Sequence, residues 1–242
     1  MSKIVRFPKP SAAEDLLDKV DGPFSTIYAD PPWRFQNRTG KMAPEHQRLL
    51  RYPTMTMEEI LELPVNRLAA AEAHLYLWIP NALVAEGLEV MRRWGFTYKT
   101  NLVWYKVRKD GGPDGRGVGF YFRNVTELLL FGVRGNMRTL QPGRTQVNLV
   151  PTRKREHSRK PDEIYDIIEA CSPAPYLELF ARHSRRGWVQ WGNEEVEDTS
   201  RYPVPNSRRE QQMVMLEPTG RQYHKSKGNT RQSKLQVRAK RA

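Results

Sequence analysis

Short apolar runs alternate along the chain with stretches in which apolar residues recur every three or four positions. The runs are typical of buried strands, and the recurring pattern is typical of helices with one buried face. The expected strands cover residues 25–29, 73–79, 97–106, 125–133, 147–151, 176–181 and 187–193. The expected helices cover residues 12–20, a short segment after Thr56, 81–95 and 160–171. Strands that alternate with helices predict an α/β domain whose sheet is mostly parallel and covered on both faces.

Several helix ends carry recognisable signals. Ser11 with Glu14, and Thr56 with Glu59, each have the spacing of a capping box, in which side chain and backbone bond reciprocally. Gly95 is expected to end the helix over 81–95. Pro161 is expected at the first position of the last helix, where its missing N–H costs nothing.

Positive charge is concentrated at the C-terminus. The 242 residues carry a formal net charge of +13, and residues 201–242 hold 11 Lys or Arg against two Asp or Glu. Such a polar segment buries too little apolar surface to order itself, so we expect a domain over 10–197 and a disordered basic tail over 198–242. The tail is either a solubilising extension or an arm that binds phosphate, and clustered basic charge favours the second interpretation.

Other residue types restrict the class of protein. Cys171 is the single cysteine, so no intramolecular disulfide can form, and the five histidines lack metal-ligand spacing. We therefore expect no metal site. The N-terminus does not resemble a secretory signal, and no run approaches the ~18 apolar residues that span a membrane. The expectation is a cytoplasmic protein without membrane contact.

The stretch "ADPPW" places Asp30, Pro31, Pro32 and Trp33 directly after the first expected strand. In open α/β sheets ligands bind beyond the carboxyl ends of strands. A carboxylate and a rigid proline carbonyl could both accept hydrogen bonds from an exocyclic amine and orient its lone pair, while an indole could stack on the base. The electrophile would need its own activation, as in the sulfonium of S-adenosylmethionine. A plain strand-ending turn is the alternative.

The chain resembles the adenine-N6 methyltransferases with a D-P-P-W motif, which include the catalytic subunit of the eukaryotic messenger-RNA methyladenosine writer and bacterial and phage members. Besides "ADPPW", the resemblance covers "YPTMTMEEI", "LYLWI", "WYK", "ELLLFGVRG", "RKPDEIYDIIE", "LELFAR" and "WGNE", in the family's order over about residues 24–195. It implies a circularly permuted Rossmann-like, S-adenosylmethionine-dependent methyltransferase domain. A permuted order agrees with the absence of G-x-G-x-x-G after the first strand.

The resemblance also implies roles for individual residues. It assigns Asp30, Pro31, Pro32 and Trp33 to catalysis, with Asp30 also beside the cofactor. Lys160 matches the lysine that holds the carboxylate of the cofactor's methionine part, and a cation placed before a helix makes sense when both face an anion.

Further matches fall at two strand ends and near the base pocket. Asn193 and Glu194 match positions that bind the cofactor's ribose. Arg182 and His183 follow "LELFA", where the family usually has a glycine in place of Ala181, which leaves their roles open. Tyr52 and Lys106 match positions near the target base, although either residue could simply pack against the core or extend to solvent.

The implied activity is methyl transfer from S-adenosylmethionine to the N6 amine of adenine in nucleic acid, with DNA favoured because a single catalytic domain with a basic tail resembles the bacterial members. RNA is the first alternative. Cytosine-N4 methylation is a second, and Asp30 argues against it because those enzymes often have serine there. The third is a catalytically silent nucleic-acid-binding subunit. Family members often pair with a paralogue, and the sequence leaves a homodimer or a paralogous subunit open.

Overall fold

The computed structural model describes residues 11–34, 54–115, 121–141, 143–153 and 159–192. They all lie within Met1–Tyr202. The basic tail that was expected over 198–242 lies outside the described residues. The strands are β1 (Phe24–Ala29), β2 (Ala69–Ile79), β3 (Thr97–Val107), β4 (Thr126–Arg134), β5 (Leu149–Arg153), β6 (Tyr176–Leu179) and β7 (Trp188–Trp191). The α-helices are α1 (Ala12–Lys19), α3 (Met57–Glu62), α4 (Val65–Leu68), α5 (Val84–Arg93) and α6 (Glu163–Cys171).

The seven strands form one sheet in the order β5-β3-β4-β2-β1-β6-β7. All neighbouring pairs are parallel except those that involve β4, which is antiparallel to both β2 and β3. The carboxyl ends of the six parallel strands and the amino end of β4 therefore meet at the same edge. We call this edge, with the residues that directly follow β1, β2, β3 and β6, the catalytic edge.

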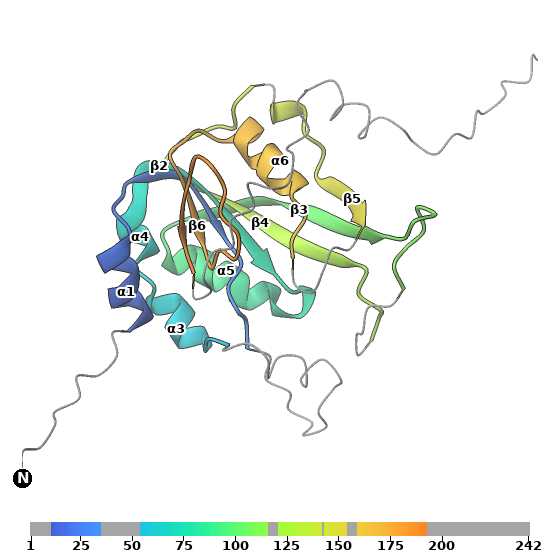
Figure 1. Ribbon diagram of the computed structural model, residues 1–242, viewed down its shortest axis with the longest axis horizontal. Helices are drawn as coiled ribbons and strands as arrows, with labels where there is room; N and C mark the ends of the chain where they lie inside the picture. The colour runs from blue at the N-terminus through green and yellow to red at the C-terminus, as the bar shows by residue number, and fades with distance from the viewer. Residues whose placement is uncertain (1–10, 35–53, 116–120, 142, 154–158, 193–242) are drawn as a thin grey trace, which may run out of the picture. The chain divides into compact units, whose positions relative to one another are not determined.

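Helices cover both faces of the sheet, as Figure 1 shows with α6 on one side and α1, α3, α4 and α5 on the other. Two buried clusters correspond to these faces. Leu16 of α1, Ile60 of α3 and Met91 of α5 pack in one cluster with alternate residues of β1 and β2. Ile164 and Ile168 of α6 pack in the other with the intervening strand residues. The period-2 alternation of the strands thus supplies two cores, and the predicted α/β class is confirmed.

Most of the local signals have their expected effect. In both capping boxes the side-chain oxygen, Ser11 Oγ or Thr56 Oγ1, accepts the third helical amide at 3.2 Å, and the glutamate oxygen accepts the cap amide at 2.7 Å. Gly95 follows α5 with a φ of +85°, a conformation that suits glycine.

The position of Pro161 differs from the prediction. Helix α6 begins at Glu163, two residues after Pro161, whose carbonyl accepts the amide of Ile164 at 3.2 Å. The chain therefore enters α6 through a tighter turn, which places Lys160 and Pro161 before the helix. Helix ends are often tightened in this way, and residue spacing alone does not reveal it.

The chain builds the sheet outward from β1 to β5 and then returns, through α6, to place β6 on the other side of β1. The strand order therefore reverses between β1 and β6. In open α/β sheets such a switch point leaves a crevice beyond the carboxyl ends, where ligands bind. Among the described helices, none is long and apolar enough to cross a membrane.

Candidate active site

Asp30 directly follows β1 at the switch point, and it faces a cation from the segment that precedes α6. Lys160 Nζ lies 2.8 Å from Asp30 Oδ2 and 3.5 Å from an oxygen of Glu127. Glu127 is the second residue of β4 and also pairs with Lys106 near the end of β3. The four side chains form a row of alternating charge along the catalytic edge, in the order Asp30, Lys160, Glu127, Lys106.

This charge row is shielded from solvent, with side-chain exposures of 26% for Asp30, 18% for Lys160, 29% for Glu127 and 14% for Lys106. Burial acts to lower the pKa of Lys160, but Asp30 and Glu127 outweigh it and hold that pKa above its ordinary value. Burial acts to raise the pKa of Glu127, yet Lys160 and Lys106 outweigh it and hold that pKa low. Both groups are therefore charged at neutral pH.

Three tryptophans line the same edge. Lys160 Nζ lies 5.2 Å from the ring centre of Trp78, and Lys106 Nζ lies 4.7 Å from that of Trp104. Such positions are favourable because an aromatic face attracts a cation. The third ring, Trp33, is only 6% exposed, and its Nε1 donates to the carbonyl of Trp78 at 2.9 Å. Trp33 thus packs into the core in this structure rather than presenting an open face, and its role as a stacking platform stays a prediction.

The two prolines stiffen the chain that follows Asp30. The Pro31 carbonyl accepts the amide of Trp33 at 2.8 Å, and the Pro32 carbonyl accepts the amide of Met55 at 3.0 Å. Because a carbonyl oxygen has two lone pairs, that of Pro31 keeps one for a further donor. These bonds fix the backbone at Pro31 and Pro32 directly after Asp30. The catalytic roles of these residues stay predictions.

The end of β6 forms the other side of the switch point and has an unusual backbone. Phe180 has a φ of +66°, in the left-handed region that non-glycine residues rarely adopt. The Ala181 amide donates to the Trp191 carbonyl at 3.0 Å, and a Cβ on Gly192 would lie 2.2 Å from the Ala181 carbonyl. The ends of β6 and β7 are therefore in close contact. Ala181 occupies the position at which the family usually has glycine. The residue with a positive φ in this structure is its neighbour, Phe180.

Arg182 and His183 follow this turn at the same end of the sheet. Nδ1 of His183 is buried and, among the described residues, has no hydrogen-bond partner. A buried polar atom without a hydrogen bond lowers the stability of the fold unless a further group, such as a ligand, forms that bond. Together with the cation of Lys160 on the β1 side of the crevice, it fits a ligand such as S-adenosylmethionine, which carries both a carboxylate and polar hydroxyl and amino groups.

A third acidic group, Glu178, lies on β6 and is buried. Glu178 of β6 accepts hydrogen bonds from the hydroxyl of Tyr165 and the amide of Gln190. Burial raises the pKa of Glu178 to about 7. Tyr28 of β1 lies on the same face of the sheet, and its hydroxyl accepts from Trp78 Nε1 at 2.6 Å. These side chains form a buried polar group on the α6 face of the sheet.

Pro31, Pro32 and Trp33 directly follow Asp30 at the end of β1, and the other predicted site residues fall into three groups. Asp30, Lys160 and Lys106 lie together in the charge row. Arg182 and His183 lie after β6 at the same edge. Tyr52, Asn193 and Glu194 lie outside the described residues, so their assignments stay predictions. Among the described residues, no group of three metal-ligating side chains could hold a metal ion.

Sequence reasoning missed Glu127, because this residue lies near the start of the apolar run that was expected as a buried strand over 125–133. Leu129 and Leu130 are buried as expected, but Glu127 stands at the amino end of an antiparallel strand and so reaches the catalytic edge. Asn81 was missed as well: it follows β2, and its Nδ2 donates to Thr126 next to Glu127. The signal that the sequence offered for Glu127 was an acidic residue at the start of an otherwise apolar strand.

Comparison with known proteins places the chain in a family. Residues 24–194 match the MT-A70 family, a span that contains β1 through β7. A Type II methyltransferase, M.MunI, from Mycoplasma sp is 30% identical over 187 residues, which cover 71% of this chain and 77% of that protein. The human N(6)-adenosine-methyltransferase catalytic subunit METTL3 is 29% identical over 177 residues, and a putative N(6)-adenosine-methyltransferase MT-A70-like protein of Medicago truncatula is 28% identical over 179.

The matched part covers 72% of this chain in both eukaryotic cases, but only 28% of the human protein and 26% of the Medicago protein. The chain therefore spans about a quarter of the length of these relatives. The family match itself extends over most of the chain and includes every residue of the charge row. On these grounds the chain belongs to the MT-A70 family.

Proposed function

We propose that this protein transfers a methyl group from S-adenosylmethionine to the exocyclic N6 amine of adenine in nucleic acid, with DNA as the preferred polymer. The observation that carries the proposal is the position of Asp30: it directly follows β1 at the switch point, next to the rigid Pro31 carbonyl and in contact with Lys160. Membership of the MT-A70 family and relatives named as N(6)-adenosine-methyltransferases support it.

In the proposed chemistry, the protein orients the amine so that its nitrogen can attack the methyl group. Its nitrogen lone pair is delocalised into the adenine ring, which makes it a poor nucleophile. Asp30 and the Pro31 carbonyl would each accept one N–H, which fixes the amine and favours the geometry of attack. The nitrogen gains the methyl group and loses one proton, which passes to water after transfer, so Asp30 need not be a strong base.

The cofactor, when bound, supplies a methyl group that is activated by a positive sulfur. Lys160 would hold the carboxylate of its methionine part, and the buried His183 Nδ1 would bond to one of its polar groups. Arg182, Asn193 and Glu194 would complete its contacts. Glu127 keeps Lys160 charged and directed along the edge, and Lys106 and Tyr52 would border the base.

The strand order supports a circularly permuted Rossmann-like topology. The strand that carries Asp30 comes first in the chain. The strands that would hold most of the cofactor, β6 and β7, come last, yet β6 pairs directly with β1 and β7 lies beyond it. In this arrangement the absence of a glycine-rich turn after β1 is expected, because the cofactor half of the crevice belongs to β6.

The preference for DNA rests on the similarity to a Type II methyltransferase of which the chain covers 77%, and on the basic net charge of +13. The test is transfer of tritium from labelled S-adenosylmethionine to duplex DNA, single-stranded DNA and RNA of one sequence. We expect transfer to DNA to exceed transfer to RNA at least tenfold. Higher transfer to RNA would reassign the substrate, and a duplex preference would require the base to be flipped out.

A silent nucleic-acid-binding subunit is the alternative from another class, and a partner subunit, either a second copy or a paralogue, is compatible with both. Titration calorimetry with S-adenosylmethionine separates them. An enzyme binds the cofactor at the catalytic edge and binds it more weakly as Lys160→Met, whereas a silent subunit shows no heat of binding in either form.

A further inference from the structure

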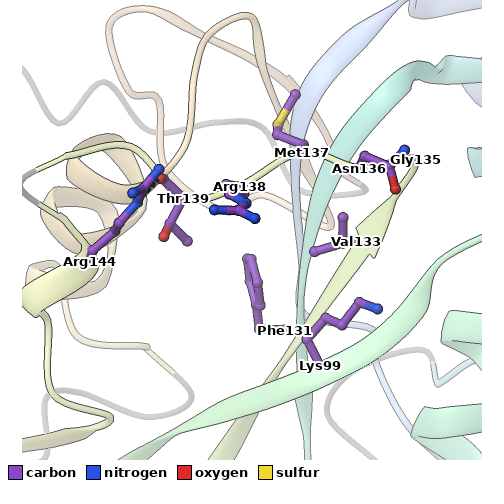
Figure 2. Close-up of a pocket in the computed structure, with 9 residues that line it drawn as sticks. All are labelled: Lys99, Phe131, Val133, Gly135, Asn136, Met137, Arg138, Thr139 and Arg144. Atoms are coloured by element: carbon purple, nitrogen blue, oxygen red, sulfur yellow. Dashed lines mark hydrogen bonds between the residues drawn. The ribbon is translucent and has the colours of Figure 1, made fainter.

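A cavity lies at the edge of the sheet opposite the catalytic edge. It is formed where β3 begins and β4 ends, on the α6 face, and has a volume of about 490 Å³. Phe131 and Val133 of β4 form its apolar floor, and Lys99, Arg138 and Arg144 contribute its charged groups. Figure 2 shows the guanidinium of Arg138 above the ring of Phe131 in this view, with Arg144 to one side and Lys99 below.

The charge of this cavity is of one sign. Three of the described residues that line it are cations, and none of them is acidic. Arg144 Nε donates to the carbonyl of Thr139 at 3.1 Å, which fixes its side chain on the rim. In the described part of the chain, no ion-pair partner faces Lys99 or Arg138. Cations that converge without counter-charges over an apolar floor favour an anionic ligand with an apolar part.

The cavity is separate from the proposed active site. Lys99 is near the start of β3 and Lys106 near its end, seven residues further along. At about 3.3 Å per residue, the two lysines are about 23 Å apart along the strand. One ligand of nucleotide size in the active site therefore cannot also fill this cavity.

We propose that this cavity binds a nucleoside phosphate, with the phosphate held by Arg138 and Arg144 and the apolar face of the sugar or base on Phe131 and Val133. Arginine suits this role because its planar fork matches phosphate oxygens. The volume lies within the roughly 300–1,000 Å³ of typical ligand pockets. An adjoining cavity of about 150 Å³ shares Phe131, Thr139 and Arg144 with the first and gives room for a longer ligand.

The ligand has two potential sources, a free nucleotide or one unit of a nucleic-acid strand, and both present the same chemistry. The first test is titration calorimetry on the full chain with AMP, adenosine and inorganic phosphate as probes. We expect AMP to bind, and adenosine and phosphate each to bind at least tenfold more weakly. No binding of AMP, or equal binding of inorganic phosphate, would overturn the proposal.

Substitutions at the two sites show which of them binds AMP. Arg138→Ala and Arg144→Ala are expected to weaken AMP binding at least tenfold, while Arg93→Ala, an exposed arginine on α5, leaves it within twofold. Asp30→Ala serves as the control for the active site and is expected to leave AMP binding unchanged. Loss of binding in Asp30→Ala, with no effect of Arg138→Ala or Arg144→Ala, would show that AMP occupies the crevice and would overturn the proposal. Thermal unfolding of each variant confirms that it is folded.

The source is distinguished by a trinucleotide of the same base. Equal affinity for AMP and the trinucleotide identifies a free nucleotide as the ligand, and at least tenfold tighter binding of the trinucleotide identifies a strand. Neither measurement requires methyl transfer. The proposal for this cavity can therefore be wrong while the proposed function is correct, and the proposed function can be wrong while this proposal is correct.

Discussion

At the residue scale, the central feature is a cation held between two carboxylates. Sequence reasoning could find Asp30, because two prolines and a tryptophan mark it, and Lys160, because a lysine before a helix opposes the helix dipole. It could not find Glu127, since its position at the catalytic edge depends on the antiparallel direction of β4. Strand direction is a tertiary property, and it decides here whether the first or the last residue of a strand reaches the site.

The role of Lys160 leads to a first prediction. Replacing it by methionine keeps the length of the side chain but removes the charge that would bind the cofactor's carboxylate. A hydrogen bond to a charged group contributes about 1.5–3 kcal/mol, so Lys160→Met should weaken S-adenosylmethionine binding about 10- to 100-fold. Calorimetry provides the measurement, and the exposed Lys109→Met is the matched control. Affinities for Lys160→Met within twofold of the parent protein would remove Lys160 from the cofactor site.

Glu178 leads to a prediction about pH. Burial raises its pKa from 4.5 to about 7, so between these values the unfolded carboxyl has lost its proton while the folded one keeps it. The folded state then binds more protons, and its stability falls as the pH rises. Glu178→Gln removes this titration. The free energy of unfolding of the parent protein, relative to that of Glu178→Gln, should fall by about 3 kcal/mol from pH 4.5 to 8, since each pH unit between the two pKa values contributes about 1.4 kcal/mol.

Urea denaturation at a series of pH values measures this difference. The exposed Glu62→Gln on α3 is the control, and its difference from the parent protein should stay level. A level difference for Glu178→Gln as well would mean that the folded state does not hold a protonated Glu178 at neutral pH.

At the element scale, the helices and strands can be predicted from the periodicity of apolar residues and from capping residues, but their arrangement in the sheet cannot. The strands at 25–29, 97–106 and 125–133 were predicted within one residue of their observed bounds, because alternation and short apolar runs mark them, whereas β2 begins four residues before the predicted 73–79. Helix α4 was missed, since four residues are too short to show a helical period. The left-handed turn at Phe180 was not predictable either, because the usual signal for a positive φ is a glycine.

The Phe180 turn supports a prediction that reverses an ordinary preference. In a strand, alanine is normally more stable than glycine by about 0.5–1 kcal/mol. At φ +66° a Cβ is strained, so Phe180→Gly should be more stable than Phe180→Ala by about 1 kcal/mol, although both lose the edge contact of the ring with Trp191. Denaturant unfolding of the two variants gives the result. The control pair, Val189→Gly and Val189→Ala on β7, should show the usual order, and the usual order at residue 180 would contradict the strained turn.

At the scale of the described domain, one sheet edge brings together residues that are far apart in the sequence. Asp30, Lys106, Glu127 and Lys160 come from four separate segments, and Arg182 and His183 come from a fifth. They converge because six strands end where the antiparallel β4 begins. The opposite edge gathers a second set of cations around a separate cavity, so the two ends of the sheet differ in what they could bind.

The most direct test of the proposed activity is the identity of the methylated nucleoside. The protein is incubated with S-adenosylmethionine and duplex DNA, the DNA is digested, and the nucleosides are measured by mass spectrometry, with Asp30→Ala and the exposed Asp18→Ala as the matched pair. The proposed function predicts N6-methyladenine with the parent protein and Asp18→Ala, and at least a hundredfold less with Asp30→Ala. N4-methylcytosine as the product, or N6-methyladenine at an undiminished level with Asp30→Ala, would contradict the proposed role of this site.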